Sequence, residues 1–178
     1  FRIKKIKRKA SKANTNIFDK LAASGAEVLI DAATLDYYAH DVYERGADLT
    51  AVVRPHDKGE LAASVATATA HGLQVIPRGG GMSYTGGYTS KTAGAVLFDL
   101  AKMDRVLDIN ESDMTVTVEP GCTWAKLHET LKPKSLRTPF WGTLSGIYAS
   151  VGGGMSQNSI FWGSGRHGTA VQSCVSLE

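Results

Sequence analysis

The groups best suited to chemistry lie in two glycine-rich segments. The first glycine segment, residues 77–87, reads Pro77-Arg78-Gly79-Gly80-Gly81-Met82-Ser83-Tyr84-Thr85-Gly86-Gly87. Consecutive glycines allow several backbone N–H groups to point into one concavity, which suits phosphate oxygens. Three hydroxyl-bearing residues add donors, and the arginine adds positive charge. These residues alone leave two interpretations open, a phosphate-binding loop and a tight structural turn.

This segment matches neither of the common nucleotide-binding motifs. A dinucleotide fingerprint needs G-x-G-x-x-G at the opening of a helix, but the sixth position counted from Gly79 is Tyr84. A Walker A loop needs Gly-Lys-Ser/Thr, whereas Lys91 follows Ser90. A phosphate site here is therefore of another type.

The second glycine segment spans residues 142–168. It holds eight glycines, and six more lie between residues 79 and 94, so these two regions contain 14 of the 19 glycines. Both are interleaved with aromatic and apolar residues, which argues against flexible linkers. Two separated clusters indicate two loops where the backbone approaches something closely or adopts positive φ.

Histidines and cysteines give no pattern for a metal site. The five histidines are scattered at His40, His56, His71, His128 and His167. No H-E-x-x-H spacing occurs, and the two cysteines, Cys122 and Cys174, lack a C-x-x-C partner. We therefore expect no metal. Such sparse cysteines weakly favour a reducing, cytoplasmic compartment, although a distant pair can still form a disulfide.

A βαβ unit is predicted to position the first glycine segment. A strand at residues 51–53 is followed by Asp57 and Glu60, which have the spacing of a helix N-cap and capping box. Gly72 is suited to end that helix, and a second strand covers residues 73–76. Loops at the carboxyl ends of such strands are where α/β folds bind ligands.

Other elements follow from periodicity and turn residues. We expect a helix at 14–24, strands at 27–30 and 95–99, a hairpin of 105–109 with 114–119, a helix capped by Thr123 and stopped by Pro133, and a strand at 171–177. The 178 residues are 43% hydrophobic and 21% charged, which excludes collagen, disorder and a disulfide scaffold. No apolar run approaches the roughly 18 residues of a membrane span.

The net charge of +3 divides unevenly along the chain. Residues 1–12 hold seven of the 20 basic residues and no acid, so the rest of the chain carries 13 basic and 17 acidic residues. A basic tail could touch nucleic acid or anionic lipid, but we expect a solvated extension and no nucleic-acid partner. A start at Phe1 suggests a processed or excised chain.

The two segments together resemble a known family. The run "PRGGGMSYTGG", the central "VEPGCTWAKLHETL" and the later "GTLSGIYASVGGGMSQNSIFWGSGRHGTAVQSCVSLE" are similar, in order and spacing, to FAD-linked oxidases of the vanillyl-alcohol oxidase / p-cresol methylhydroxylase (PCMH) family. The resemblance covers residues 36–178. Within the family, "YYAHDVYERGADLTAVVRP" is similar to the D-lactate dehydrogenase and glycolate oxidase type.

The resemblance implies an α+β fold, a PCMH-type FAD-binding domain of two α/β subdomains with FAD between them. It would occupy residues 14–178, truncated at its C-terminal end, after a basic tail at 1–13. In this family a separate C-terminal domain covers the flavin and supplies substrate and catalytic residues. That domain would be a partner missing from this chain, so we expect no turnover by the chain alone.

The resemblance also implies the FAD contacts. Residues 78–87 would cradle the pyrophosphate. The predicted cofactor-binding set is Pro77, Arg78, Gly79, Gly80, Gly81, Met82, Ser83, Tyr84, Thr85, Gly86, Gly87, Pro120, Gly121, Ser145, Gly146, Ser150, Gly152, Gly153, Gly163, Gly165, His167, Gly168 and Thr169. His167 could contact the flavin or make a structural hydrogen bond. Trp141, Phe161 and Trp162 could stack on the flavin or belong to the core or the subdomain interface.

The implied activity is oxidation of a 2-hydroxy acid or other alcohol, a small-molecule substrate, by hydride transfer to FAD. Many relatives attach the flavin covalently through a histidine after Gly-Gly-Gly, where this chain has Met82, and others through a cysteine absent between residues 123 and 173. FAD is therefore expected to bind non-covalently through this segment. Two alternatives remain, a flavin- or nucleotide-binding module without turnover and a basic-tailed domain that binds nucleic acid or membrane.

Overall fold

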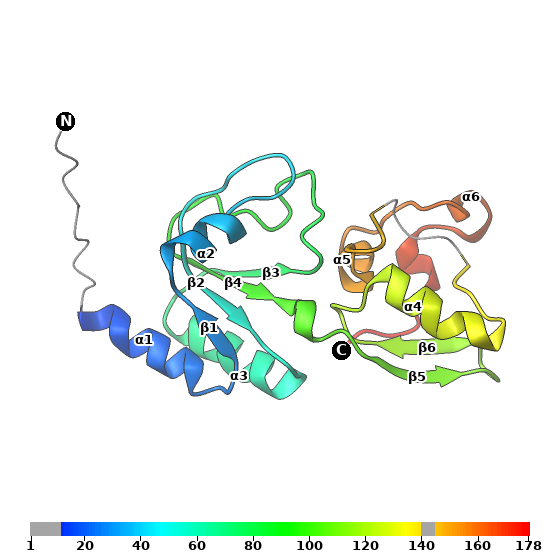
Figure 1. The fold of residues 1–178 in the computed structure, drawn as a ribbon, viewed down its shortest axis with the longest axis horizontal. Helices are drawn as coiled ribbons and strands as arrows, with labels where there is room; N and C mark the ends of the chain where they lie inside the picture. The colour runs from blue at the N-terminus through cyan, green and yellow to red at the C-terminus, as the bar shows by residue number, and fades with distance from the viewer. Residues whose placement is uncertain (1–11, 140–144) are drawn as a thin grey trace.

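The computed structural model describes residues 12–139 and 145–178. They form two lobes that lie side by side in Figure 1, residues 12–99 in lobe 1 and residues 103–178 in lobe 2. The short 3₁₀ helix η1 (Leu100–Lys102) connects them. Residues 1–11, which include most of the predicted tail, and Trp141 lie outside the described residues.

Lobe 1 is built on a four-stranded sheet. The strands are β1 (Glu27–Leu29), β2 (Leu49–Arg54), β3 (Val75–Arg78) and β4 (Ala95–Asp99), in the order β1-β2-β4-β3. β1 pairs antiparallel with β2, whereas β2, β4 and β3 are parallel. The carboxyl ends of three neighbouring strands therefore meet at one edge, and the first glycine segment leaves from that edge.

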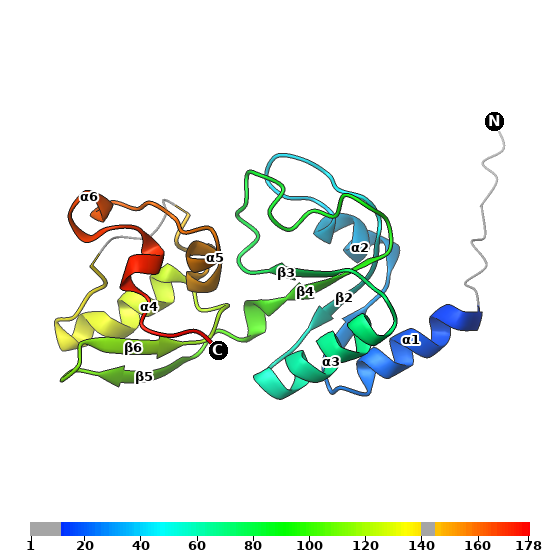
Figure 2. The same ribbon diagram turned by 180° about the vertical axis from the view of Figure 1, so that it is seen from behind.

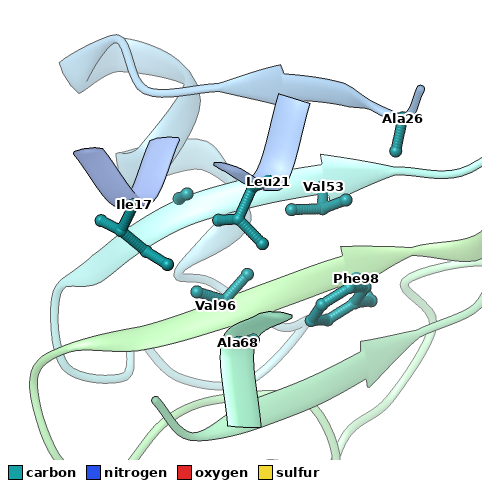
Figure 3. Close-up of a cluster of buried hydrophobic side chains, with 8 residues drawn as sticks. Ile17, Leu21, Ala26, Val53, Ala68, Val96 and Phe98 are labelled. Carbon is teal, nitrogen blue, oxygen red and sulfur yellow. The ribbon is translucent and has the colours of Figure 1, made fainter. Parts of the chain in front are cut away.

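Helices cover both faces of this sheet. α1 (Lys12–Ala22) and α3 (Lys58–Ala70) pack on one face, where Ile17, Leu21, Ala68, Val53 and Phe98 form a buried cluster (Figure 3). α2 (Ala32–Tyr38) covers the other face, against Val52 and Leu97. Neighbouring residues of β2 and β4 thus point to opposite faces, as the two-residue repeat of a strand requires.

The predicted N-cap and glycine stop of α3 are confirmed, but the predicted capping box is not formed. The carboxylate of Asp57 accepts a hydrogen bond of 2.9 Å from the N–H of Glu60. The Glu60 carboxylate accepts one of 2.8 Å from the N–H of His56, one residue before the position that a capping box would use. Gly72 has φ +69°, the left-handed conformation that ends a helix.

Lobe 2 packs helices on a hairpin. β5 (Val106–Asn110) and β6 (Thr115–Val118) pair antiparallel as predicted. The helices are α4 (Trp124–Leu131), α5 (Val151–Ser156) and α6 (Ser164–His167), with 3₁₀ turns η2 (Lys132–Lys134) and η3 (Ala170–Ser173). Cys122 is fully buried in this core, and burial raises the pKa of its thiol to about 11. Cys122 and Cys174 form no disulfide.

Several element predictions need correction. The strand expected at 171–177 is wrong: its first three residues belong to η3, because the Thr169 N–H donates to the Gln172 side chain at 2.7 Å and starts a turn. No strand follows it among the described residues, and Val175 and Leu177 are 82% and 81% exposed. The short helices α2, α5 and α6 were not predicted. Among the described residues, no helix has both the length and the apolar composition to cross a membrane.

Candidate functional site

The two glycine segments meet at the boundary between the lobes. A Cβ atom on Gly80 would overlap the carbonyl of Tyr148, and one on Gly79 would overlap the hydroxyl of Ser150. Figures 1 and 2 show the same arrangement, with the connection from β3 to β4 opposite α5. Residues that are about 70 positions apart in the sequence therefore form one surface, as expected of two segments that bind one ligand.

The turn at Pro120 and Gly121 belongs to the same surface. The N–H of Gly152 donates to the carbonyl of Pro120 at 3.1 Å, and a Cβ on Gly152 would lie 2.7 Å from that oxygen. The N–H of Gly121 donates to the carbonyl of Met103 at 2.8 Å. The turn thus joins the lobe connection to α5.

The second glycine segment reaches this boundary through a capped turn. The backbone of Ser145 accepts hydrogen bonds from the N–H groups of Tyr148 and Ala149 at 2.9 and 2.8 Å. The hydroxyl of Ser150 caps α5 by accepting from the N–H of Gly153 at 3.2 Å. The carbonyl of Gly146 accepts from Ala125 in α4 at 3.0 Å, so α4 fixes the start of this turn.

One carboxylate anchors the first glycine segment to the connection between α2 and β2. Asp41 accepts hydrogen bonds of 2.7 Å from the N–H groups of Tyr43, Glu44 and Gly86. Desolvation acts to raise the pKa of Asp41, but these three donors outweigh it and hold the pKa below its usual value of 3.8. The N–H of Val42 also donates to the carbonyl of Ser83 at 3.1 Å.

The middle of the first glycine segment carries unused donors. The N–H groups of residues 80–84 have no hydrogen-bond partner among the described residues. By contrast, the N–H groups of Thr85 and Gly87 donate to the hydroxyl of Ser83 at 3.2 and 3.0 Å. Successive backbone N–H groups without partners can donate hydrogen bonds to phosphate oxygens. These residues therefore fit the pyrophosphate of FAD.

An aromatic pocket lies beside these donors. It has a volume of about 200 Å³ and is lined by Tyr37, His40, Asp41, Val42, Arg78, Gly81 and Tyr88. The Arg78 guanidinium lies 4.8 Å from the ring centroid of Tyr38 and 5.2 Å from that of Tyr88. Burial, together with a hydrogen bond to Asp99, raises the pKa of Tyr38 to about 12. The sequence analysis did not predict Tyr38, Tyr88 or Asp41 as site residues, because no local motif marks them.

The structure places the last predicted residues elsewhere. Gly163, Gly165, His167 and Gly168 lie in or beside α6, which is farther from lobe 1 than α5 is (Figure 1). The side chain of His167 is exposed. FAD contacts from these residues and from Thr169 stay predictions.

The predicted aromatic residues divide between core and surface. Phe161 is buried and packs edge-on against Trp124, with ring centroids 5.0 Å apart, so it belongs to the core of lobe 2. Trp162 is 74% exposed. No three His, Cys, Asp or Glu side chains among the described residues are grouped to hold a metal ion.

Comparisons with known proteins support FAD as the cofactor. A family described as FAD binding domain matches residues 49–178. The chain is 28% identical over 109 residues to a glycolate oxidase subunit of Bacillus subtilis, covering 61% of this chain and 23% of that protein. It is 29% identical over 159 residues to a mitochondrial D-lactate dehydrogenase [cytochrome] of Arabidopsis thaliana, covering 85% and 27%.

Among solved structures, p-cresol methylhydroxylase with substrate bound has a TM-score of 0.71 at 20% identity, covering 84% of this chain and 30% of that one. This likeness confirms the predicted α+β, PCMH-type fold, and the family match confirms FAD as the cofactor. The chain spans about a quarter of the length of the curated relatives it matches.

Proposed function

Because this chain belongs to the FAD binding domain family, we propose that it is the FAD-binding part of an oxidoreductase that oxidises a 2-hydroxy acid or a related alcohol. Glycolate and D-lactate, the substrates named for two relatives, are both 2-hydroxy acids. When bound, FAD supplies the flavin ring that accepts a hydride. The described residues would bind and orient the cofactor.

The observation that carries the proposal is the row of free N–H groups at residues 80–84, at the boundary with the second glycine segment. These donors would hold the pyrophosphate oxygens. Pro120, Ser145 and Ser150 would face the rest of the cofactor from lobe 2. Residues that act on the substrate would come from the part of the relatives' length that this chain does not span.

Binding is tested with the purified protein and three ligands: FAD, ADP and riboflavin. We expect FAD to bind with quenching of its fluorescence, and ADP to compete with it because ADP carries the same pyrophosphate. Failure of the protein to bind either FAD or ADP would contradict the proposal.

The reaction is tested by anaerobic mixing of FAD-loaded protein with glycolate, D-lactate and simple alcohols. We expect a longer protein that contains this chain to be bleached at the flavin absorbance band by a 2-hydroxy acid, and the chain alone to stay oxidised. If no substrate bleaches the longer protein, the alternative of a flavin-binding module without turnover is favoured. Rapid bleaching of the chain alone would show that the catalytic groups lie within it.

A further inference from the structure

Three neighbouring strands end in a row of charged residues at the sheet edge from which the first glycine segment leaves. Arg54 ends β2, Asp99 ends β4 and Arg78 ends β3. Arg78 pairs with Asp99 in the strand register, and Val53 pairs with Phe98, which places Arg54 beside Asp99 on the other side. One carboxylate therefore lies between two guanidinium groups at the carboxyl edge of the parallel sheet.

The carboxylate of Asp99 is only 2% exposed and is shared unequally between the two arginines. Its Oδ2 atom lies 3.3 Å from Nε of Arg54 and accepts a hydrogen bond of 2.7 Å from the hydroxyl of Tyr38. Its Oδ1 atom accepts from the N–H of Ala101 at 3.2 Å and lies 3.7 Å from Nη1 of Arg78. Arg54 is thus the closer partner.

Arg54 also has a second partner that Arg78 lacks. Glu27 lies 3.3 Å from Nη1 of Arg54. Among the described residues, Arg78 has no carboxylate other than Asp99 within ion-pair distance. The Nε atoms of both arginines are buried without a hydrogen-bond partner, but the side chain of Arg78 is the less exposed, 12% against 28% for Arg54, and it lies against tyrosine rings. Because Arg78 shares its one carboxylate with Arg54, the row has an excess of positive charge at its Arg78 end. Such a charge is costly to bury, because its hydration is lost without full compensation.

The guanidinium of Arg78 contacts the glycine segment at Gly81, among the residues with free N–H groups. A Cβ on Gly81, which has φ +69°, would overlap Nη2 of Arg78. The hydroxyl of Tyr88, whose ring lies against the same guanidinium, donates to the carbonyl of Gly81 at 2.8 Å. Gly81 is one of the residues whose N–H groups are unused. The guanidinium therefore lies directly against the backbone of the proposed pyrophosphate cradle at Gly81.

We propose that Arg78 is the residue that makes this site select phosphate-bearing flavins, through its incompletely compensated charge beside residues 80–84. This rests on the proposed function. The charge adds to the field of the N–H groups and favours a ligand with an anionic pyrophosphate. It gives no advantage to riboflavin, which has no phosphate.

The test compares three variants, R78Q, R78K and R54Q, by titration with FAD, ADP and riboflavin at low and moderate salt. Arg78→Gln should weaken FAD and ADP binding about tenfold or more, with a smaller effect as salt screens the charge, and leave riboflavin binding unchanged. Arg78→Lys should stay within about threefold of wild type, because it keeps the positive charge that acts on the phosphates even though it loses the stacked guanidinium. Arg54→Gln is the matched control, since it removes the other partner of Asp99 but on the strand farther from the glycine segment.

Circular dichroism at the assay temperature first establishes which variants are folded. If Arg78→Gln is unfolded, the folded Arg78→Lys variant provides the test. A tenfold loss of ADP binding by Arg78→Lys would overturn the proposal. It is also overturned if wild type binds FAD but Arg78→Gln binds equally well, if Arg54→Gln loses as much affinity, or if riboflavin affinity falls in parallel. Wild type that binds neither FAD nor ADP would instead overturn the proposed function itself.

Discussion

At the residue scale, the first glycine segment depends on a side chain about 45 positions earlier, Asp41. We expect Asp41→Ala to weaken FAD binding several-fold and to lower the free energy of unfolding by about 2 kcal/mol, because three backbone N–H groups lose a charged acceptor. Urea denaturation and FAD titration measure the two effects. Asp19→Ala, at an exposed position of α1, is the control and should change neither. Equal behaviour of the two variants would show that the segment holds its shape without Asp41.

We predict that this segment holds the flavin without a covalent bond. Met82 stands where the resemblance described above would place a linking histidine, and a thioether does not form that link. We therefore expect acid precipitation of the FAD-loaded protein to release all of the flavin into the supernatant. Flavin that stays with the pellet would contradict this prediction.

At the scale of elements, α5 depends on glycines that the rest of lobe 2 encloses. A Cβ on Gly152 would lie 2.7 Å from the carbonyl oxygen of Pro120, whereas one on Gly165 in α6 would meet nothing within 4 Å. We expect Gly152→Ala to lower the free energy of unfolding by about 2 kcal/mol through overpacking. Gly165→Ala should be neutral or stabilising by up to about 1 kcal/mol, because alanine favours helix. Chemical denaturation of both variants checks the contrast, and a Gly152→Ala protein as stable as wild type would refute it.

The start of β5 and the end of β6 are held together by Arg105 and Glu119. The Glu119 carboxylate, nearly buried, accepts from the backbone N–H, Nε and Nη2 of Arg105 at 2.8, 3.0 and 2.6 Å. The hydrogen bonds from Arg105 outweigh desolvation and hold the pKa of Glu119 below its usual value of 4.5. Glu119→Gln should therefore lower the free energy of unfolding by about 2 kcal/mol at pH 7.

This difference should depend on pH in a defined direction. A carboxyl group with a lowered pKa in the folded state contributes stability above its unfolded pKa, and that contribution is lost as the pH falls through the folded pKa. The gap between wild type and Glu119→Gln should thus shrink below pH 4.5. Glu111→Gln, which breaks an exposed ion pair with Lys134, is the control and should cost less than about 1 kcal/mol at any pH. A gap that stays constant into acid would contradict the assignment.

These elements also show what the sequence could predict. The caps of α3 and the hairpin turn were predictable because their signals lie within a few residues of the element they end. α5 was not, because three consecutive glycines have low helix propensity and the helix depends on contacts with distant Pro120 and Trp124. The strand expected at 171–177 was wrong because a strand needs a neighbour to pair with, and none pairs with these residues in the described part of the chain.

At the scale of the whole molecule, the lobes touch through backbone at Gly80. Gly80 does not have a positive φ, so its own backbone tolerates a methyl group, but that group would overlap the Tyr148 carbonyl and press on the Cα of Ala149 in the other lobe. We expect Gly80→Ala to push the lobes apart and weaken FAD binding at least several-fold, while each lobe stays folded. Limited proteolysis should cut residues 100–103 faster than in wild type or in Gly165→Ala. Unchanged cleavage and affinity would show that the lobes accommodate the methyl group.

The site as a whole was predictable only in part. Its two glycine segments were evident from composition, and the structure brings Gly79 and Gly80 against the turn before α5. Asp41, Arg54 and Asp99 were not evident, because strand register and loop packing bring them to the first segment from distant parts of the chain. No spacing in the sequence encodes those neighbours.

The buried Cys122 has a practical consequence for spectroscopy. A thiol with a pKa of about 11 and no exposed surface hardly reacts with alkylating reagents near neutral pH, whereas Cys174 is partly exposed. A maleimide dye would therefore attach at one position of the native chain, after η3 in lobe 2. Energy transfer between that dye and a second fluorophore on lobe 1 would then follow lobe separation in solution without any engineered cysteine in lobe 2.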